Sequence, residues 1–128
     1  MKAGDTFIVS YPGDEPSDLW IIATDPLVND EIVMFRFVPV NPRVDPICIV
    51  RRGEHPEITR DVSVLYEASV IRDHNKVQAA LAAGCTLGRP VSGPVLLRIQ
   101  QGALDSDHTS ERLKRIVRAS MKAPKTTP

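Results

Sequence analysis

The sequence has no long hydrophobic run and no apolar segment at its start. None of its 128 residues lie in an apolar stretch that approaches the roughly 20 residues needed to span a bilayer. Residues 1–5 (MKAGD) lack the apolar core of a secretory signal. We therefore expect no membrane-spanning helix and a cytoplasmic location.

Cysteine and histidine are scarce and scattered. Cys48 and Cys85 lie far apart and neither has a CxxC partner, and His55, His74 and His108 are widely separated. This spacing excludes the common zinc motifs. Without an export signal, two distant cysteines are more often buried thiols than a disulfide. We expect no metal and no cofactor.

The chain also lacks net charge, since 16 basic residues balance 16 acidic ones. This balance argues against a protein that holds nucleic acid through its overall charge. The distribution is uneven, with acids concentrated in residues 1–31 and bases in residues 112–125. The basic segment is either a local basic face or the solvated side of a helix, and the second interpretation is the more common one.

The first half of the chain reads as five short strands, expected at residues 5–11, 19–24, 31–40, 46–51 and 62–71. The third is the strongest of them, with Val33, Phe35 and Phe37 on one face and Ile32, Met34, Arg36 and Val38 on the other, and the fifth shows a period of two. Residues 12–18 form a proline- and glycine-containing loop. So many short strands predict a mainly β fold, built as a small SH3-like five-stranded antiparallel barrel.

Two to three α-helices are predicted to follow and to pack on this barrel. Asp73 is a suitable N-cap for a helix over 75–83, and Gly84 suits the position after its end. Pro94 suits the first turn of a second helix, and Thr109 is the expected cap of a third over 110–121. Residues 94–120 also resemble a helix–turn–helix pair, although such a pair after a β domain more often packs than reads DNA. We expect one domain over 1–121, with the barrel at 1–72, the helical part at 73–121 and a disordered tail at 122–128.

The order of these elements resembles the MazF/PemK toxins, which are small endoribonucleases with an SH3-like barrel. The residues that carry the resemblance are MKAGDT at 1–6, LWIIATDP at 19–26 and SVLYEASVI at 63–71. The likeness covers nearly the whole chain and comes from order and spacing, since no single motif is specific. It implies metal-independent RNA cleavage, an antitoxin protein as partner, and a homodimer.

Two departures from the family place its usual chemistry in doubt. The family has an arginine beside a proline before its second strand, where this chain has Pro16-Ser17-Asp18. The family also has a threonine or serine after its third strand, where residues 38–43 read VPVNPR. The segment 53–56 (GEHP) is likewise unlike the standard toxins and indicates a divergent branch.

Other residues can supply the chemistry that RNA cleavage requires, namely a base, an acid and a cation near the phosphorane. We expect a polar loop between the last two strands, with His55 facing solvent as the proton-transfer group. Arg51, Arg52 or Arg60 then supplies the cation, with Arg60 as the assigned catalytic residue, and Asp61 orients the imidazole. The alternative is that His55 is an ordinary turn residue, which is the more common case.

Four further arginines are candidates for RNA binding: Arg36, Arg43, Arg51 and Arg52. For Arg36 and Arg43, a salt bridge with Asp30, Glu31 or Asp45 is an equally good interpretation. Trp20 is more often a core residue than a base-stacking one. Two functions therefore stay open, a toxin-type endoribonuclease and a non-catalytic SH3-like module that binds protein or nucleic acid.

Overall fold

A computed structural model of the chain describes residues 2–9, 18–26, 30–44 and 46–122. The strands are β1 (Thr6–Val9), β2 (Asp18–Ile22), β3 (Glu31–Pro39), β4 (Ile49–Val50), β5 (Val62–Asp73) and β6 (Thr86–Leu87). The helices are α1 (His74–Gly84), α2 (Gly93–Asp105) and α3 (Glu111–Lys122). The predicted mainly β fold with C-terminal helices is confirmed. Most of the predicted loop at 12–18 and of the predicted tail lies outside the described residues.

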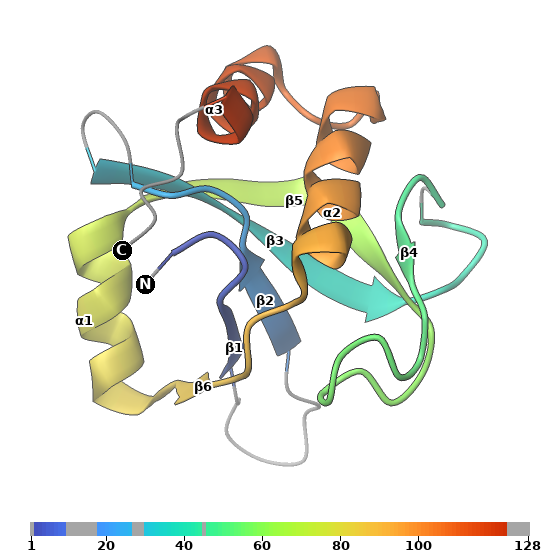
Figure 1. Ribbon diagram of the computed structural model, residues 1–128, viewed down its shortest axis with the longest axis horizontal. Helices are drawn as coiled ribbons and strands as arrows, with labels where there is room; N and C mark the ends of the chain where they lie inside the picture. Colours follow the sequence, from blue (N-terminus) through green and yellow to red (C-terminus); the bar gives the residue numbers. More distant parts are fainter. Residues whose placement is uncertain (1, 10–17, 27–29, 45, 123–128) are drawn as a thin grey trace.

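The strands form one curled antiparallel sheet in the order β4-β5-β3-β2-β1-β6 (Figure 1). This sheet has six strands, where the sequence predicted five. The additional strand β6 is only two residues long and pairs with β1. The predicted strand at 46–51 shrinks to the two residues of β4, which is one edge of the sheet.

The central strand β3 divides the core into two layers. Val33, Phe35 and Phe37 belong to one buried cluster, whereas Ile32 and Met34 belong to the other. The alternation predicted for β3 is therefore confirmed. Since both faces of this strand are covered, its side chains are almost all apolar.

An irregularity in the pairing of β3 with β5 bends the sheet. Their register is regular up to Met34↔Val70 and resumes at Arg36↔Leu65, so four residues of β5 lie opposite Phe35 alone. The hydroxyl of Ser69 donates a hydrogen bond to the carbonyl of Tyr66 within this bulge. Bulges increase the local twist of a strand, which accounts for the curl at this position.

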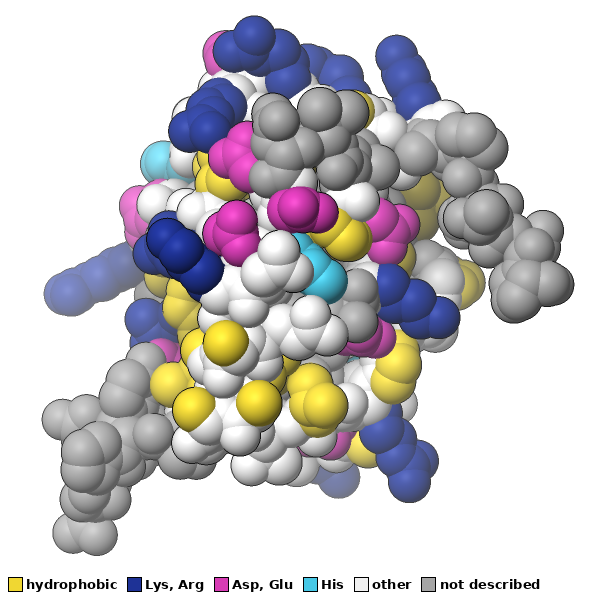
Figure 2. Space-filling view, turned by 90° about the vertical axis from the view of Figure 1, so that its left-hand side faces the viewer, with side chains coloured by type: hydrophobic (Ala, Val, Ile, Leu, Met, Phe, Trp, Pro, Cys, Tyr) yellow, Lys and Arg dark blue, Asp and Glu magenta, His cyan; other side chains and the backbone are white. Residues whose placement is uncertain are grey.

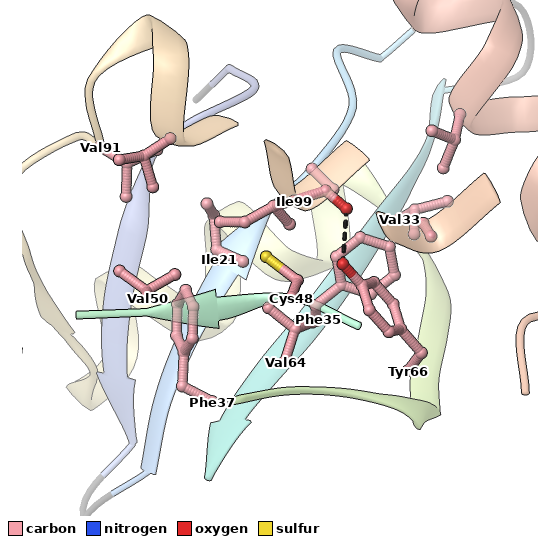
Figure 3. Close-up of a cluster of buried hydrophobic side chains, with 14 of the residues drawn as sticks. Ile21, Val33, Phe35, Phe37, Cys48, Val50, Val64, Tyr66, Val91 and Ile99 are labelled. Atoms are coloured by element: carbon pink, nitrogen blue, oxygen red, sulfur yellow. Dashed lines mark hydrogen bonds between the residues drawn. The ribbon is translucent and has the colours of Figure 1, made fainter. Parts of the chain in front are cut away.

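The larger core cluster lies under α2 and α3 (Figure 3). Tyr66 and Phe35 meet edge to face, with their ring centroids 5.1 Å apart. The buried hydroxyl of Tyr66 donates to the carbonyl of Ile99 in α2, at 2.7 Å. This hydrogen bond satisfies the single polar atom of the ring and fixes the helix over the sheet.

The smaller cluster lies on the opposite face, where Val77 brings α1 against Phe7, Ile22, Ile32 and Met34. Trp20 is partly buried there and stacks on Phe7, with centroids 6.4 Å apart and ring planes at 7°. This position agrees with the interpretation of Trp20 as a packing residue.

The helix ends confirm two predictions and correct two. The Asp73 side chain accepts from the backbone of Asn75 and Lys76, as expected of an N-cap. Pro94 lies in the first turn of α2, behind the cap Ser92. Gly84 is the last residue of α1, and Cys85 is its C-cap. The prediction that Gly84 lies just after the helix is therefore wrong.

The cap of α3 was also assigned incorrectly. The hydroxyl of Ser110 accepts from Leu113 N–H, whereas the Thr109 side chain is buried. Both residues have the hydroxyl that a cap requires, so local sequence did not separate them. No helix in the described parts of the chain is long and apolar enough to cross a membrane.

Candidate functional site

The segment 51–61 between β4 and β5 is a compact loop, hereafter the polar loop. Two turns close it, through hydrogen bonds from Glu54 N–H to the Arg51 carbonyl and from Ile58 N–H to the His55 carbonyl. Gly53 has a φ of 91°, which glycine adopts without strain. Ile58 is buried in the larger core cluster and anchors the loop from below.

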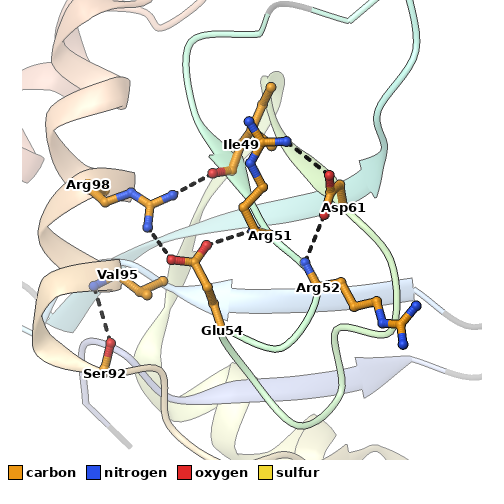
Figure 4. A network of polar contacts seen from close by, with 8 residues as sticks. All are labelled: Ile49, Arg51, Arg52, Glu54, Asp61, Ser92, Val95 and Arg98. Carbon is orange, nitrogen blue, oxygen red and sulfur yellow. Dashed lines mark hydrogen bonds and ion pairs between the residues drawn. The ribbon is translucent and has the colours of Figure 1, made fainter.

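A carboxylate network holds the outer side of the polar loop (Figure 4). Asp61 accepts from the Arg52 backbone N–H at 2.9 Å and from Arg51 Nη1 at 3.0 Å. The backbone hydrogen bond from Arg52, followed by the bond from Arg51, lowers the pKa of Asp61. Asp61 is therefore engaged by the two arginines at the start of the loop, and the contacts of the His55 ring are made with other residues.

A second carboxylate joins the polar loop to α2. Glu54 accepts from Arg98 Nη1 at 2.5 Å and from Arg51 N–H at 2.6 Å, while Arg98 Nη2 donates to the Ile49 carbonyl at 2.5 Å. The hydrogen bond from Arg98 is the main cause that lowers the pKa of Glu54, and the same bond raises the pKa of Arg98. Arg98 thus fastens both the loop and the edge strand β4 to the helix.

The imidazole of His55 lies inside the molecule, with a side chain only 1% exposed. Its Nε2 lies 2.5 Å from the carbonyl oxygen of Arg89. Because a carbonyl only accepts, Nε2 carries a proton and donates. The hydroxyl of Thr6 donates to the same carbonyl at 2.7 Å. The expectation that His55 faces solvent is wrong, because the segment before α2 covers the ring.

The other ring nitrogen, Nδ1, meets two atoms of Glu57. It lies 3.1 Å from the Glu57 backbone N–H, which donates to it when the ring is neutral. It also lies 3.0 Å from the Oε2 atom of the Glu57 side chain. Oε2 is buried and has no hydrogen-bond partner within the described chain. A protonated ring satisfies this oxygen, whereas a neutral ring satisfies the N–H.

The remaining predicted residues are not gathered at one place. Arg36 forms an ion pair with Asp18 at 3.0 Å. Asp18 was not among the acids that we expected from the sequence, which were Asp30, Glu31 and Asp45. Arg43 and Arg60 are exposed, and no ion pair is found for either among the described residues. Arg51 and Arg52 lie on the polar loop, as predicted.

Two surface hollows flank this region. One, of about 440 Å³, is formed by the polar loop and is lined by Arg52, Gly53, Glu54, His55, Pro56, Ile58 and Thr59. The other, of about 310 Å³, lies between β4 and α2 and is lined by Ile47, Cys48, Ile49, Arg98, Gln101, Gly102 and Asp105. Within the described ranges, no group of three or more acids, histidines and cysteines is placed to bind a metal.

Sequence reasoning missed the residues that organise the loop: Thr6, Glu54, Glu57, Arg89 and Arg98. Arg89 acts through its backbone carbonyl, which gives no signal in a sequence. Arg98 lies on the exposed side of α2 and looks like any solvated charge. Glu57 is two residues from His55, so its spacing alone was a usable signal.

Comparison with known proteins does not add to these observations. No protein-family model, curated protein or solved structure matches the chain. The functional argument therefore depends on the residues themselves.

Proposed function

We propose that this chain is a toxin-type protein of the MazF/PemK kind that acts as a non-catalytic, RNA-binding module. The order of its elements along the chain, and a curled antiparallel sheet followed by helices, support this proposal. In this proposal the sheet is an opened relative of the SH3-like barrel. A homodimer and an antitoxin partner follow from the same resemblance.

The single observation that favours binding over cleavage is the burial of the His55 imidazole. A general base must come within roughly 2.6–3.2 Å of the proton that it removes. The His55 side chain is 1% exposed and its Nε2 is occupied by the Arg89 carbonyl. Asp61, its predicted partner, is held by Arg51 and Arg52. His55 and Asp61, two of the residues proposed for catalysis, thus form hydrogen bonds that hold the polar loop in place.

Exposed arginines of the polar loop and of the segment between β3 and β4 support contact with RNA. Arg43, Arg52 and Arg60 are exposed, and the described residues place no carboxylate against their guanidinium groups. In Figure 4 the Arg52 side chain extends away from the network around Asp61. A guanidinium group binds phosphate oxygens in a bidentate manner, which suits these residues to a phosphodiester backbone.

The test measures binding and cleavage on the same RNA. The purified chain is mixed with a long, unstructured, end-labelled RNA in EDTA, and is followed by fluorescence anisotropy and on a denaturing gel. We expect salt-dependent binding without cleavage above the protein-free blank. The double variant Arg52→Gln/Arg60→Gln should bind more weakly, with Lys76→Gln/Arg72→Gln as a matched control. An absence of binding at low salt would overturn the proposal.

The metal-independent endoribonuclease is the second candidate, and one observation favours it. His55 Nδ1 and Glu57 Oε2 form a close acid–base pair, 3.0 Å apart, within the polar loop. Cleavage through this pair requires the Arg89 carbonyl to leave Nε2. EDTA-resistant cleavage that is lost in both His55→Gln and Glu57→Gln, at unchanged folding, would establish this candidate. The glutamine amide in His55→Gln retains a donor for the Arg89 carbonyl, so this variant can keep the hydrogen bond between the polar loop and the segment before α2.

A further inference from the structure

The outward face of α3 is the most basic surface among the described helices. Its inward face is apolar, with Leu113 and Val117 buried in the larger core cluster. The opposite face is exposed and consists of Glu111, Arg112, Arg115, Arg118, Ala119 and Lys122. Figure 2 shows dark-blue side chains gathered at the top of the molecule, the height at which α3 lies in Figure 1.

Three of these cations have no acidic partner within the described part of the chain: Arg115, Arg118 and Lys122. Arg112, in contrast, is paired with Glu31 at 2.8 Å. Lys114 is mostly covered and lies 4.0 Å from Glu111. These three charges, hereafter the α3 cations, outnumber Glu111, the acid on the same exposed face, and therefore give this face a net positive potential.

The polar loop does not offer a comparable potential. Its three bases, Arg51, Arg52 and Arg60, are balanced by Glu54, Glu57 and Asp61. Its network also pairs Arg51 with Asp61, and Glu54 with Arg98 of α2. A polyanion attracted to this protein by charge therefore finds its strongest complement on α3.

The composition of the face identifies the kind of partner. The centre of a protein interface is well packed and desolvated, with aromatic side chains and arginines as its common anchors, whereas the outward face of α3 has no aromatic residue and only Ala119 as an apolar one. The exposed side of α2 differs, because Leu97 is 55% exposed there. Contact with a phosphate backbone requires cations alone. The α3 face thus suits a nucleic acid better than a protein.

The spacing of the cations agrees with this partner. An α-helix rises about 1.5 Å per residue, so Arg115 to Lys122 spans roughly 10 Å along the axis. At about 3.4 Å per nucleotide of a stacked strand, this length matches roughly three phosphates. We propose that Arg115, Arg118 and Lys122 bind the phosphate backbone of single-stranded RNA, an inference that rests on the proposed RNA-binding function.

The test is the salt dependence of RNA binding by the full chain. Each phosphate contact contributes about 0.7 to the slope of log K against log salt for a single strand. The triple variant Arg115→Gln/Arg118→Gln/Lys122→Gln should lower this slope by about 2, since it removes three contacts. Glutamine has nearly the helix propensity of the residues it replaces, so α3 should remain folded, as circular dichroism will verify.

A matched control removes the same charge elsewhere. Lys2→Gln/Arg72→Gln/Lys76→Gln neutralises three exposed cations on other parts of the chain and should leave the slope unchanged. Equal losses in the two triple variants, or an unchanged slope in the α3 variant while the parent protein still binds RNA, would overturn this inference and leave the proposed function intact. Failure of the parent protein itself to bind would overturn both. Tighter binding of a single-stranded DNA of equal length would contradict the choice of RNA.

Discussion

Gly102 lies in the last turn of α2, still inside the helix, where glycine is unfavourable, and the reason is the close approach of Tyr66 from β5. A Cβ atom at this position would meet the Tyr66 ring carbon that bears the hydroxyl and the Cys48 Cβ, both at 3.1 Å, and the Tyr66 hydroxyl oxygen closer still. That hydroxyl is the group that donates to the Ile99 carbonyl at 2.7 Å. The Gly102→Ala variant must therefore displace either the tyrosine or the helix.

The expected effect is a reversal of the usual sign. Replacing glycine by alanine inside a helix normally stabilises a protein by about 0.5–1 kcal/mol. Overpacking here costs roughly 1–3 kcal/mol, and loss of the Tyr66 hydrogen bond adds about 0.5–1.5 kcal/mol. We expect a net destabilisation of about 0.5–4 kcal/mol, which lowers Tm by about 4 °C per kcal/mol for a domain of this size.

Thermal and urea unfolding of the two alanine variants will test this reasoning. Gly84→Ala is the matched control, because a Cβ there meets nothing within 4 Å and its φ is not positive. It should raise the free energy of unfolding by up to about 1 kcal/mol. In the Gly102→Ala background, Tyr66→Phe should cost less than it does alone, since it removes the obstructing oxygen. If Gly102→Ala stabilises the protein as much as Gly84→Ala does, the close approach of α2 to β5 is refuted.

Two further predictions concern titration and thiol reactivity. The hydrogen bond from Arg98 lowers the pKa of Glu54, whose ordinary value is 4.5. The stability that this carboxylate contributes is therefore present above about pH 4.5 and is lost as the pH falls through the lowered folded value. The pair is partly exposed, so urea titrations of Glu54→Gln should show a loss of acid sensitivity of at most about 1 kcal/mol. An unchanged pH profile would contradict the role of Glu54. Burial raises the pKa of the Cys48 thiol, whereas Cys85 is partly exposed. A thiol reagent should thus label Cys85 in the folded protein and Cys48 only on unfolding, as mass spectrometry of the labelled protein will show; rapid labelling of Cys48 in the folded state would contradict its burial.

Parts of the fold could be predicted because they depend on neighbouring residues. The two faces of β3 follow from the pleat of a strand, which points successive side chains to opposite sides, and Asp73 caps α1 through hydrogen bonds to residues two and three positions away. Predictions failed where local signals were equal or weak. Thr109 and Ser110 both have a hydroxyl that can cap a helix. Only the packing of the folded chain decides that Thr109 is buried and that Ser110 accepts from Leu113 N–H. Strand β6 has two residues, too few to show a period.

The sequence determined where the longer strands and the three helices of the described chain lie, since periodicity and capping operate over a few neighbouring positions. The tertiary structure alone decided what the polar loop can do. His55 reaches Arg89 across 34 positions, and Glu54 reaches Arg98 across 44. Contacts of this range follow from how the helices and the connecting segment return to the sheet. The sequence therefore suggests an exposed His55 beside Pro56, whereas the folded chain buries this ring against the backbone carbonyl of Arg89.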